Sequence, residues 1–93
     1  MADDPEALAQ IARLLGDASV RNASLDQVGA RVDERFSLLV EGLMGEATAS
    51  DDVIDRESAL AFLDDRLRFL GGLLSEPQRA RLREALREKI EAW

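Results

Sequence analysis

The chain has 93 residues and a formal net charge of −7; 46% of its residues are apolar and 33% are charged. This composition predicts one soluble globular domain over residues 1–93, and it excludes intrinsically disordered, collagen-like and membrane-spanning proteins. The sequence has no Cys and no His, which excludes disulfides, thiol nucleophiles, Cys-ligated metals and His-based catalysis. We therefore expect no enzymatic activity, no cofactor and no transition-metal site.

The first predicted helix covers residues 5–15. Asp4 is a good N-cap because Pro5 follows it at the first helical position. Apolar residues then recur at helical spacing: Leu8, Ile11, Ala12 and Leu15. Gly16 favours an end to this helix, because glycine readily adopts the left-handed backbone conformation found there. The connector over residues 17–23 has no predicted conformation.

A long second helix is predicted from residue 25 to about Met44. Ser24 and Gln27 form a capping box at its start. Its apolar residues advance by about 3.6 positions on average: Leu25, Val28, Val32, Phe36, Leu39 and Leu43. Such a helix would be about 30 Å long. We expect Gly45 to end it and the small polar residues 45–50 to form a loop.

The third helix is predicted to begin at Asp51 or Asp52 and to end at Leu70. It carries a heptad seam and a second apolar stripe beside the seam. The seam contains Val53, Leu60, Leu63, Leu67, Leu70 and Leu74, and the second stripe contains Ala59, Phe62, Phe69 and Leu73. This apolar arc is wider than one partner helix can cover, so we expect the third helix to be the central element.

A fourth helix is predicted from Ser75 to Trp93, after the Gly71-Gly72 stop. Ser75 and Gln78 form its capping box. The connector is short, so the third and fourth helices should form an antiparallel hairpin. The expected fold is therefore all-α, an antiparallel four-helix bundle with a short first helix and long second and third helices. Whether the first helix packs on its own chain or is exchanged with a neighbour stays open.

Charge is distributed unevenly along the chain, with −8 over residues 1–75 and +1 over residues 76–93. The acidic body should repel phosphates and anionic lipids, so we expect no nucleic-acid partner and no membrane partner. The basic series from Arg79 to Lys89 is interleaved with glutamates, and we interpret it as a solvated helix face. The start of the chain is acidic and has no apolar run, which together with the absence of Cys predicts a cytoplasmic protein.

Residues 51–55 spell the D-D-x-x-D pattern, which resembles the motif that isoprenoid synthases use to hold a magnesium diphosphate. On one helix, Asp51 and Asp55 would lie one turn apart and could share a hard cation. We favour a simpler interpretation, in which these acids cap a helix and interact with the positive end of its dipole. Whether Asp51, Asp52 and Asp55 bind a divalent cation stays open.

The leading functional hypothesis is a small acidic protein-interaction module that self-associates as a homodimer or docks on a larger protein as an adaptor, assembly factor or regulator. Chains below about 100 residues often complete their core by oligomerisation. The expected interface lies mainly on the third helix and comprises Leu60, Phe62, Leu63, Leu67, Phe69, Leu70 and Trp93. Trp93 is interpreted either as a cover over the end of the bundle or as an anchor for the partner.

The alternative hypothesis is an acidic inhibitor that mimics nucleic acid in the basic groove of a nucleic-acid enzyme. It rests on a row of acids on the third helix: Asp51, Asp52, Asp55, Glu57, Asp64 and Asp65. Small size and low pI fit this hypothesis as well as they fit the first.

Overall fold

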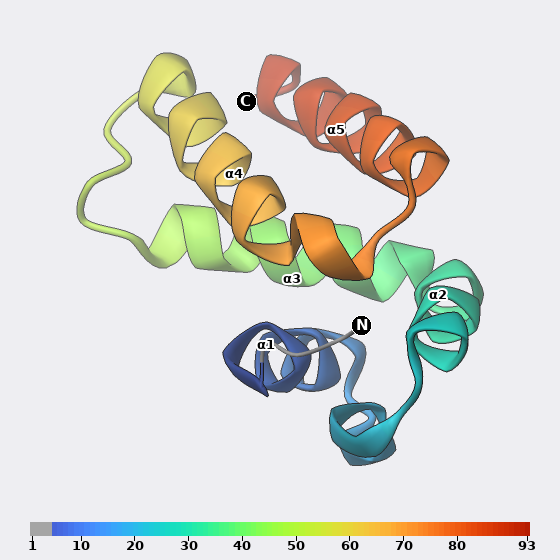
Figure 1. Cartoon of the computed structure of the whole chain (residues 1–93). Helices are drawn as coiled ribbons and strands as arrows, with labels where there is room; N and C mark the ends of the chain where they lie inside the picture. The colour runs from blue at the N-terminus through green and yellow to red at the C-terminus, as the bar shows by residue number, and fades with distance from the viewer. Residues whose placement is uncertain (1–4) are drawn as a thin grey trace.

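The computed structural model describes residues 5–93, and all the regular secondary structure in this range is helical. The prediction of an all-α fold is confirmed. Asp4, the predicted N-cap of the first helix, lies outside the described residues. The helices are shown in Figure 1 and follow in the order α1 (Pro5–Leu15), η1 (Ala18–Asn22), α2 (Leu25–Glu34), α3 (Phe36–Ala49), α4 (Arg56–Leu70), η2 (Gly71–Leu73) and α5 (Glu76–Glu91).

Helix α3 is the central element, and it packs against α1, α2, α4 and α5. Helices α4 and α5 cover one side of α3, and α1 lies on the other side (Figure 1). Four of its side chains enter the core: Leu39, Val40, Leu43 and Ala47. This arrangement corrects the expectation that the helix ending at Leu70 would be central. That helix, α4, packs against α1, α3 and α5.

The predicted long second helix is divided at Arg35, where φ is −122° and ψ is 35°. The hydrophobic period continues across the break, because both Val32 and Leu39 are buried, and periodicity therefore did not reveal it. A tertiary contact accompanies the break: Arg35 Nη1 donates a hydrogen bond to the Leu15 carbonyl oxygen at 2.9 Å. The guanidinium thus satisfies a free carbonyl at the end of α1, where the helix dipole favours a positive charge.

The boundaries around residue 50 also differ from the prediction. Helix α3 continues through Gly45 to Ala49, so the predicted loop over residues 45–50 is wrong. The connector lies further along the chain, and α4 begins at Arg56 rather than at residue 51 or 52. Asp55 is the N-cap of α4, and it forms a reciprocal capping box with Ser58. Of the three aspartates in the D-D-x-x-D pattern, the structure selects the last one as the cap.

Glycine has two distinct structural roles in this fold. Gly16 ends α1 with a φ of 65°, as its sequence position predicts. Gly42 lies inside α3, where a Cβ atom would come within 2.6 Å of Leu14 Cδ2. The missing side chain therefore lets α1 approach α3 closely. At Gly45, one turn further along α3, a Cβ atom would have no neighbour within 4 Å.

Gln78 joins the start of α5 to α2. Its Oε1 atom accepts a hydrogen bond from the Ser75 backbone N–H at 3.0 Å, which completes the predicted capping box. Its Nε2 atom donates to the Gly29 carbonyl oxygen and to Asp33 Oδ1, both at 3.0 Å. The side chain is buried, so these partners replace the water that an exposed amide would bind.

A second polar cluster joins α1, α3 and α4. Gln10 is buried on α1 and donates a hydrogen bond from its amide to Glu46 Oε2 on α3. Arg13 donates to the amide oxygen of Gln10. The other oxygen of the Glu46 carboxylate, Oε1, lies 3.5 Å from Arg66 Nε of α4. This oxygen accepts no hydrogen bond. The carboxylate of Glu46 is therefore held by a neutral amide and by a cation from two different helices.

Gln78→Glu tests the bridge between α5 and α2. The glutamate keeps the capping acceptor but loses the amide donor, and at neutral pH it places a carboxylate against Asp33 and the Gly29 carbonyl. Gln27→Glu is the matched control, because Gln27 has the same capping role at an exposed position. We expect Gln78→Glu to lower the free energy of unfolding by about 2 kcal/mol more than the control. Equal effects in urea denaturation at pH 7 would contradict the bridge.

Gly45→Ala and Gly42→Ala test the close approach of α1 to α3. Alanine at residue 45 should raise the free energy of unfolding by about 1 kcal/mol, because it improves helix propensity and meets no neighbour. Alanine at residue 42 should stabilise less, or destabilise, because Leu14 has to move away from the new methyl group. Thermal denaturation of the two variants measures the difference. If both variants gain the same stability, α1 does not lie against Gly42.

Candidate functional site: the groove between α4 and α5

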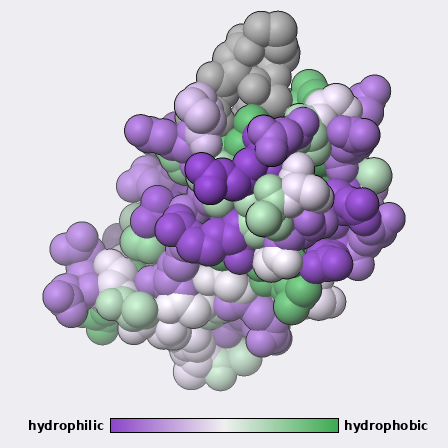
Figure 2. Space-filling model, turned by 90° about the horizontal axis from the view of Figure 1, so that it is seen from below, coloured by the Kyte–Doolittle hydropathy of each residue, from purple (hydrophilic) through white to green (hydrophobic). Residues whose placement is uncertain are grey.

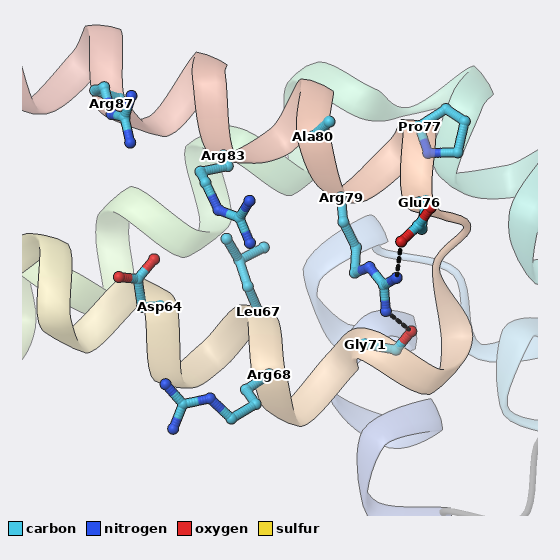
Figure 3. A pocket seen from close by; sticks show the side chains of 10 residues that line it. All are labelled: Asp64, Leu67, Arg68, Gly71, Glu76, Pro77, Arg79, Ala80, Arg83 and Arg87. Carbon is cyan, nitrogen blue, oxygen red and sulfur yellow. Dashed lines mark hydrogen bonds and ion pairs between the residues drawn. The ribbon is translucent and has the colours of Figure 1, made fainter.

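An open groove of about 930 Å³ runs between α4 and α5, with α3 lying behind the two helices (Figure 3). It is lined by Asp64, Leu67, Arg68, Gly71, Glu76, Pro77, Arg79, Ala80, Arg83 and Arg87. A smaller pocket of about 80 Å³ shares Asp64, Leu67, Arg83 and Arg87 with it and adds Leu60, Leu63 and Leu86. The two hollows therefore form one continuous surface, which we call the α4–α5 groove.

The antiparallel pairing of α4 and α5 creates this groove. The short segment between Leu70 and Glu76 reverses the chain. At the other end of the pair, Arg56 Nη2 donates a hydrogen bond to the Trp93 carbonyl oxygen at 2.6 Å. Both ends of the hairpin are thus fixed, and the facing side chains of the two helices lie at defined heights along the groove.

Helical spacing places the basic side chains of α5 on one wall. Arg79, Arg83 and Arg87 are four residues apart, so they project from the same face of the helix. In Figure 3 the side chain of Arg83 extends from α5 toward Leu67 of α4. Arg68 comes from the α4 side. The groove therefore has Leu67 at its floor, three arginines on its α5 wall and one arginine, Arg68, on the α4 side.

Only part of this positive charge is neutralised inside the chain. Arg79 donates to the Gly71 carbonyl oxygen at 3.1 Å and lies 3.8 Å from Glu76 Oε1. Arg68 forms an exposed ion pair with Asp65 at 3.5 Å. Within residues 5–93, Arg83 and Arg87 form no ion pair and no side-chain hydrogen bond. The groove is thus locally basic on a chain whose net charge is −7.

The residues of the predicted interface do not share one surface. Leu63, Leu67 and Leu70 belong to the core, although the first two also reach the groove floor. Leu60 is 37% exposed and lines the smaller of the two hollows that form the groove. The remaining three lie outside the groove: Phe62 is half-buried beneath Arg66, Phe69 is 37% exposed and Trp93 is 44% exposed.

The arginines of α5 line the candidate site, and they were not among the interface residues predicted from the sequence. The interleaved glutamates favoured a solvated face, and one of them, Glu76, does pair with Arg79. The four-residue spacing of Arg79, Arg83 and Arg87 was the available signal. It places all three on one side of the helix, whereas Glu84 and Glu88 lie outside the groove. The pairing with α4, which converts that side into a groove wall, is a property of the tertiary structure.

The connector between α3 and α4 carries the acids of the D-D-x-x-D pattern, and it projects beyond the helices at the left of Figure 1. Asp51 and Asp52 are exposed, and the side chain of Ile54 is 84% exposed. Asp55 is occupied as a cap and accepts a hydrogen bond from the Ser58 backbone N–H at 2.8 Å. Across residues 5–93, no group of three acidic side chains is arranged to hold a metal ion.

The face seen from below the view of Figure 1 is mostly hydrophilic, and its apolar residues are scattered (Figure 2). A hollow of about 340 Å³ between α2 and η2 contains Gln78 and Asp33, and these two side chains already bind each other. The α4–α5 groove is therefore the better candidate for binding a partner.

Comparison with known proteins gave no match to a protein family, a curated protein or a solved structure. Among the described residues, every helix is too short or too polar to cross a lipid bilayer. The side chains of the groove and the connector are therefore the features of this chain that point to a function.

Asp55→Asn tests the cap of α4 through its pH dependence. The backbone N–H and the hydroxyl of Ser58 hold the pKa of Asp55 below its ordinary value of 3.8. A lowered pKa stabilises the fold above pH 3.8, and this stability is lost as the pH falls through the folded-state value. Asparagine still caps but does not titrate in this range.

We therefore expect the melting temperature of the Asp55→Asn variant to fall less than that of the unchanged chain between about pH 5 and pH 2. Asp51→Asn is the control, because this nearby carboxylate caps no helix. Thermal melts followed by circular dichroism provide the measurement. If the Asp55→Asn variant and the unchanged chain lose the same stability as the pH falls, the capping hydrogen bond of Asp55 contributes nothing to acid sensitivity.

Proposed function

We propose that the chain is a small protein-interaction module, and that its α4–α5 groove binds an acidic segment of a partner protein that also carries apolar side chains. The observation that supports this proposal is the pair of arginines, Arg83 and Arg87, that stand over an apolar floor without partners in residues 5–93. Both side chains are exposed in the single chain, and arginines that lose their water on binding are among the residues that dominate binding energy in protein interfaces.

The two kinds of side chain make different contributions to binding. The exposed apolar surface of the groove comes from Leu60, Pro77 and Ala80, and its burial drives association. The guanidinium groups recognise carboxylates through two parallel hydrogen bonds, which adds geometric specificity. They also speed the encounter with an acidic segment, and salt weakens this effect.

The surrounding negative charge supports a peptide ligand over a nucleic acid. A long polyanion has to lie along much of the surface, where the net charge of −7 repels it. A short acidic segment meets only the local field of the groove. The groove is open, and its polar side chains are arginines, Asp64 and Glu76, which supports binding rather than catalysis. We place this module in the cytoplasm and assign it no cofactor.

The alternative function, a mimic of nucleic acid, has less support from the arrangement of the acids. Asp55 is used as a helix cap, and Asp65 pairs with Arg68. Asp64 lines the groove, beside the arginines. The row of acids expected on one helix face is therefore split between the connector, the groove and an ion pair.

Binding of a designed peptide tests the proposed function. The probe is a fluorescein-labelled amphipathic helix of leucine and glutamate, and its counterpart carries lysine in place of glutamate. We expect the glutamate peptide to bind with an affinity that falls as salt is raised. Arg83→Glu should weaken this binding by about tenfold, equivalent to about 1.4 kcal/mol.

Arg21→Glu is the matched control, because it makes the same charge change at an exposed position on η1. This variant should bind the glutamate peptide like the unchanged chain. Fluorescence polarisation measures each affinity. The proposal fails if the lysine peptide binds equally well, or if both variants weaken binding to the same extent.

A further inference from the structure

We propose that the groove of one chain binds the connector of a second copy of the same chain, so that two copies form a symmetric dimer. The bound segment comprises residues 51–54, which we call the acidic loop. This inference rests on the proposed function, because it uses the same groove, and it names the partner. The observation that supports it is an exposed isoleucine preceded by two carboxylates without partners in residues 5–93, on a chain whose groove combines exposed apolar side chains with arginines.

The acidic loop has the chemistry that the groove requires. Ile54 is the most exposed of the large apolar side chains in the described part of the chain. Asp51 and Asp52 precede it, and within residues 5–93 their carboxylates form no ion pair and no hydrogen bond. An apolar side chain close to two carboxylates complements a groove in which the exposed Pro77 and Ala80 lie among arginines.

Backbone hydrogen bonds hold the acidic loop in place before it binds. The Asp52 N–H donates to Ser50 Oγ at 3.3 Å, and the Val53 N–H donates to the Ser50 carbonyl oxygen at 3.3 Å. The Ile54 N–H donates to Ser58 Oγ at 2.8 Å. A segment that is already ordered loses less conformational entropy when it docks, so more of the contact energy is available for association.

The loop does not reach the Arg68 and Arg79 end of its own groove. It is attached to the start of α4, and α4 has 15 residues, which corresponds to a length of roughly 22 Å at the helical rise. That end of the groove lies at the far end of α4, near Gly71. The loop of a second copy has no such restriction.

Two-fold symmetry allows both contacts between an acidic loop and a groove to form in the same dimer. If the α4 helices of two copies lie antiparallel across an axis near their midpoints, the start of each helix faces the end of the other. Each acidic loop then meets the Arg68 and Arg79 end of the opposite groove, and the exposed Leu60 side chains lie near the middle of the contact. Such an interface is self-complementary and closed, so it yields a dimer rather than a filament.

Charge reversal on each side of the contact tests the dimer. The loop variant carries Asp51→Lys and Asp52→Lys, and the groove variant carries Arg68→Glu and Arg83→Glu. Sedimentation velocity from micromolar to millimolar concentration should show a dimer for the unchanged chain. Each variant alone should dimerise at least about tenfold more weakly. An equimolar mixture of the two variants should restore association, because a lysine loop then faces a glutamate groove.

A control variant separates this contact from a general charge effect. Glu84→Lys with Glu88→Lys changes the net charge by the same amount as the loop variant, at exposed positions of α5 outside the groove. It should dimerise like the unchanged chain. The proposal is overturned if the unchanged chain stays monomeric throughout, if neither variant weakens the dimer, or if the mixture does not associate.

Failure of the dimer and failure of the proposed function are distinguishable. The loop variant has an intact groove, so it should still bind the leucine–glutamate peptide. If the unchanged chain is monomeric and the peptide still binds, the groove takes another acidic partner and the self-docking proposal alone is wrong. If neither the peptide nor a second copy binds, both proposals are wrong.

Discussion

The change of chain direction at Arg35 is the constraint on which the rest of this structure depends. A continuous helix from residue 25 to residue 49 would carry α2 along the axis of α3, away from η1 and η2, which α2 contacts in this structure. The backbone N–H and carbonyl of Arg35 keep helix-type hydrogen bonds to Arg31 and Leu39 across the change of direction, and the guanidinium of the same residue caps the end of α1. Arg35 thus ends α2, directly precedes α3 and donates a hydrogen bond to the last carbonyl of α1.

The groove follows from the same arrangement. Because α3 occupies one face of the α4–α5 pair, the leucines on that face complete the core, and the other face is left with short apolar side-chain surfaces between long arginines. Arginine suits this position, since its aliphatic stem covers apolar surface while the guanidinium stays in water. A locally basic groove can therefore form on an acidic protein. It requires only that arginines spaced by four residues on α5 lie on the side of the hairpin that α3 does not cover.

Local sequence signals predicted much of the fold. The stop at Gly16 and the capping boxes at Ser24 and Ser75 are present in the structure, because each depends on residues within one turn of the helix end. The break at Arg35 was not predictable, because its partner, Leu15, is twenty positions away and the apolar period runs through it. At Gly45 the sequence predicted a helix end where the structure has none. A glycine inside a helix is tolerated when the surrounding residues pack. The groove arginines were visible as a charged series, but their common wall depends on the pairing of α4 with α5.

Gln78 shows how one side chain can tie together segments that are far apart in the chain. Its amide oxygen serves its own helix, and its amide nitrogen serves residues 29 and 33. The cap of α5 is local, but the amide nitrogen of Gln78 is satisfied only when the distant α2 packs against it. Loosening either segment leaves polar groups of the other without partners, so we expect the beginning of α5 and α2 to open as one cooperative unit.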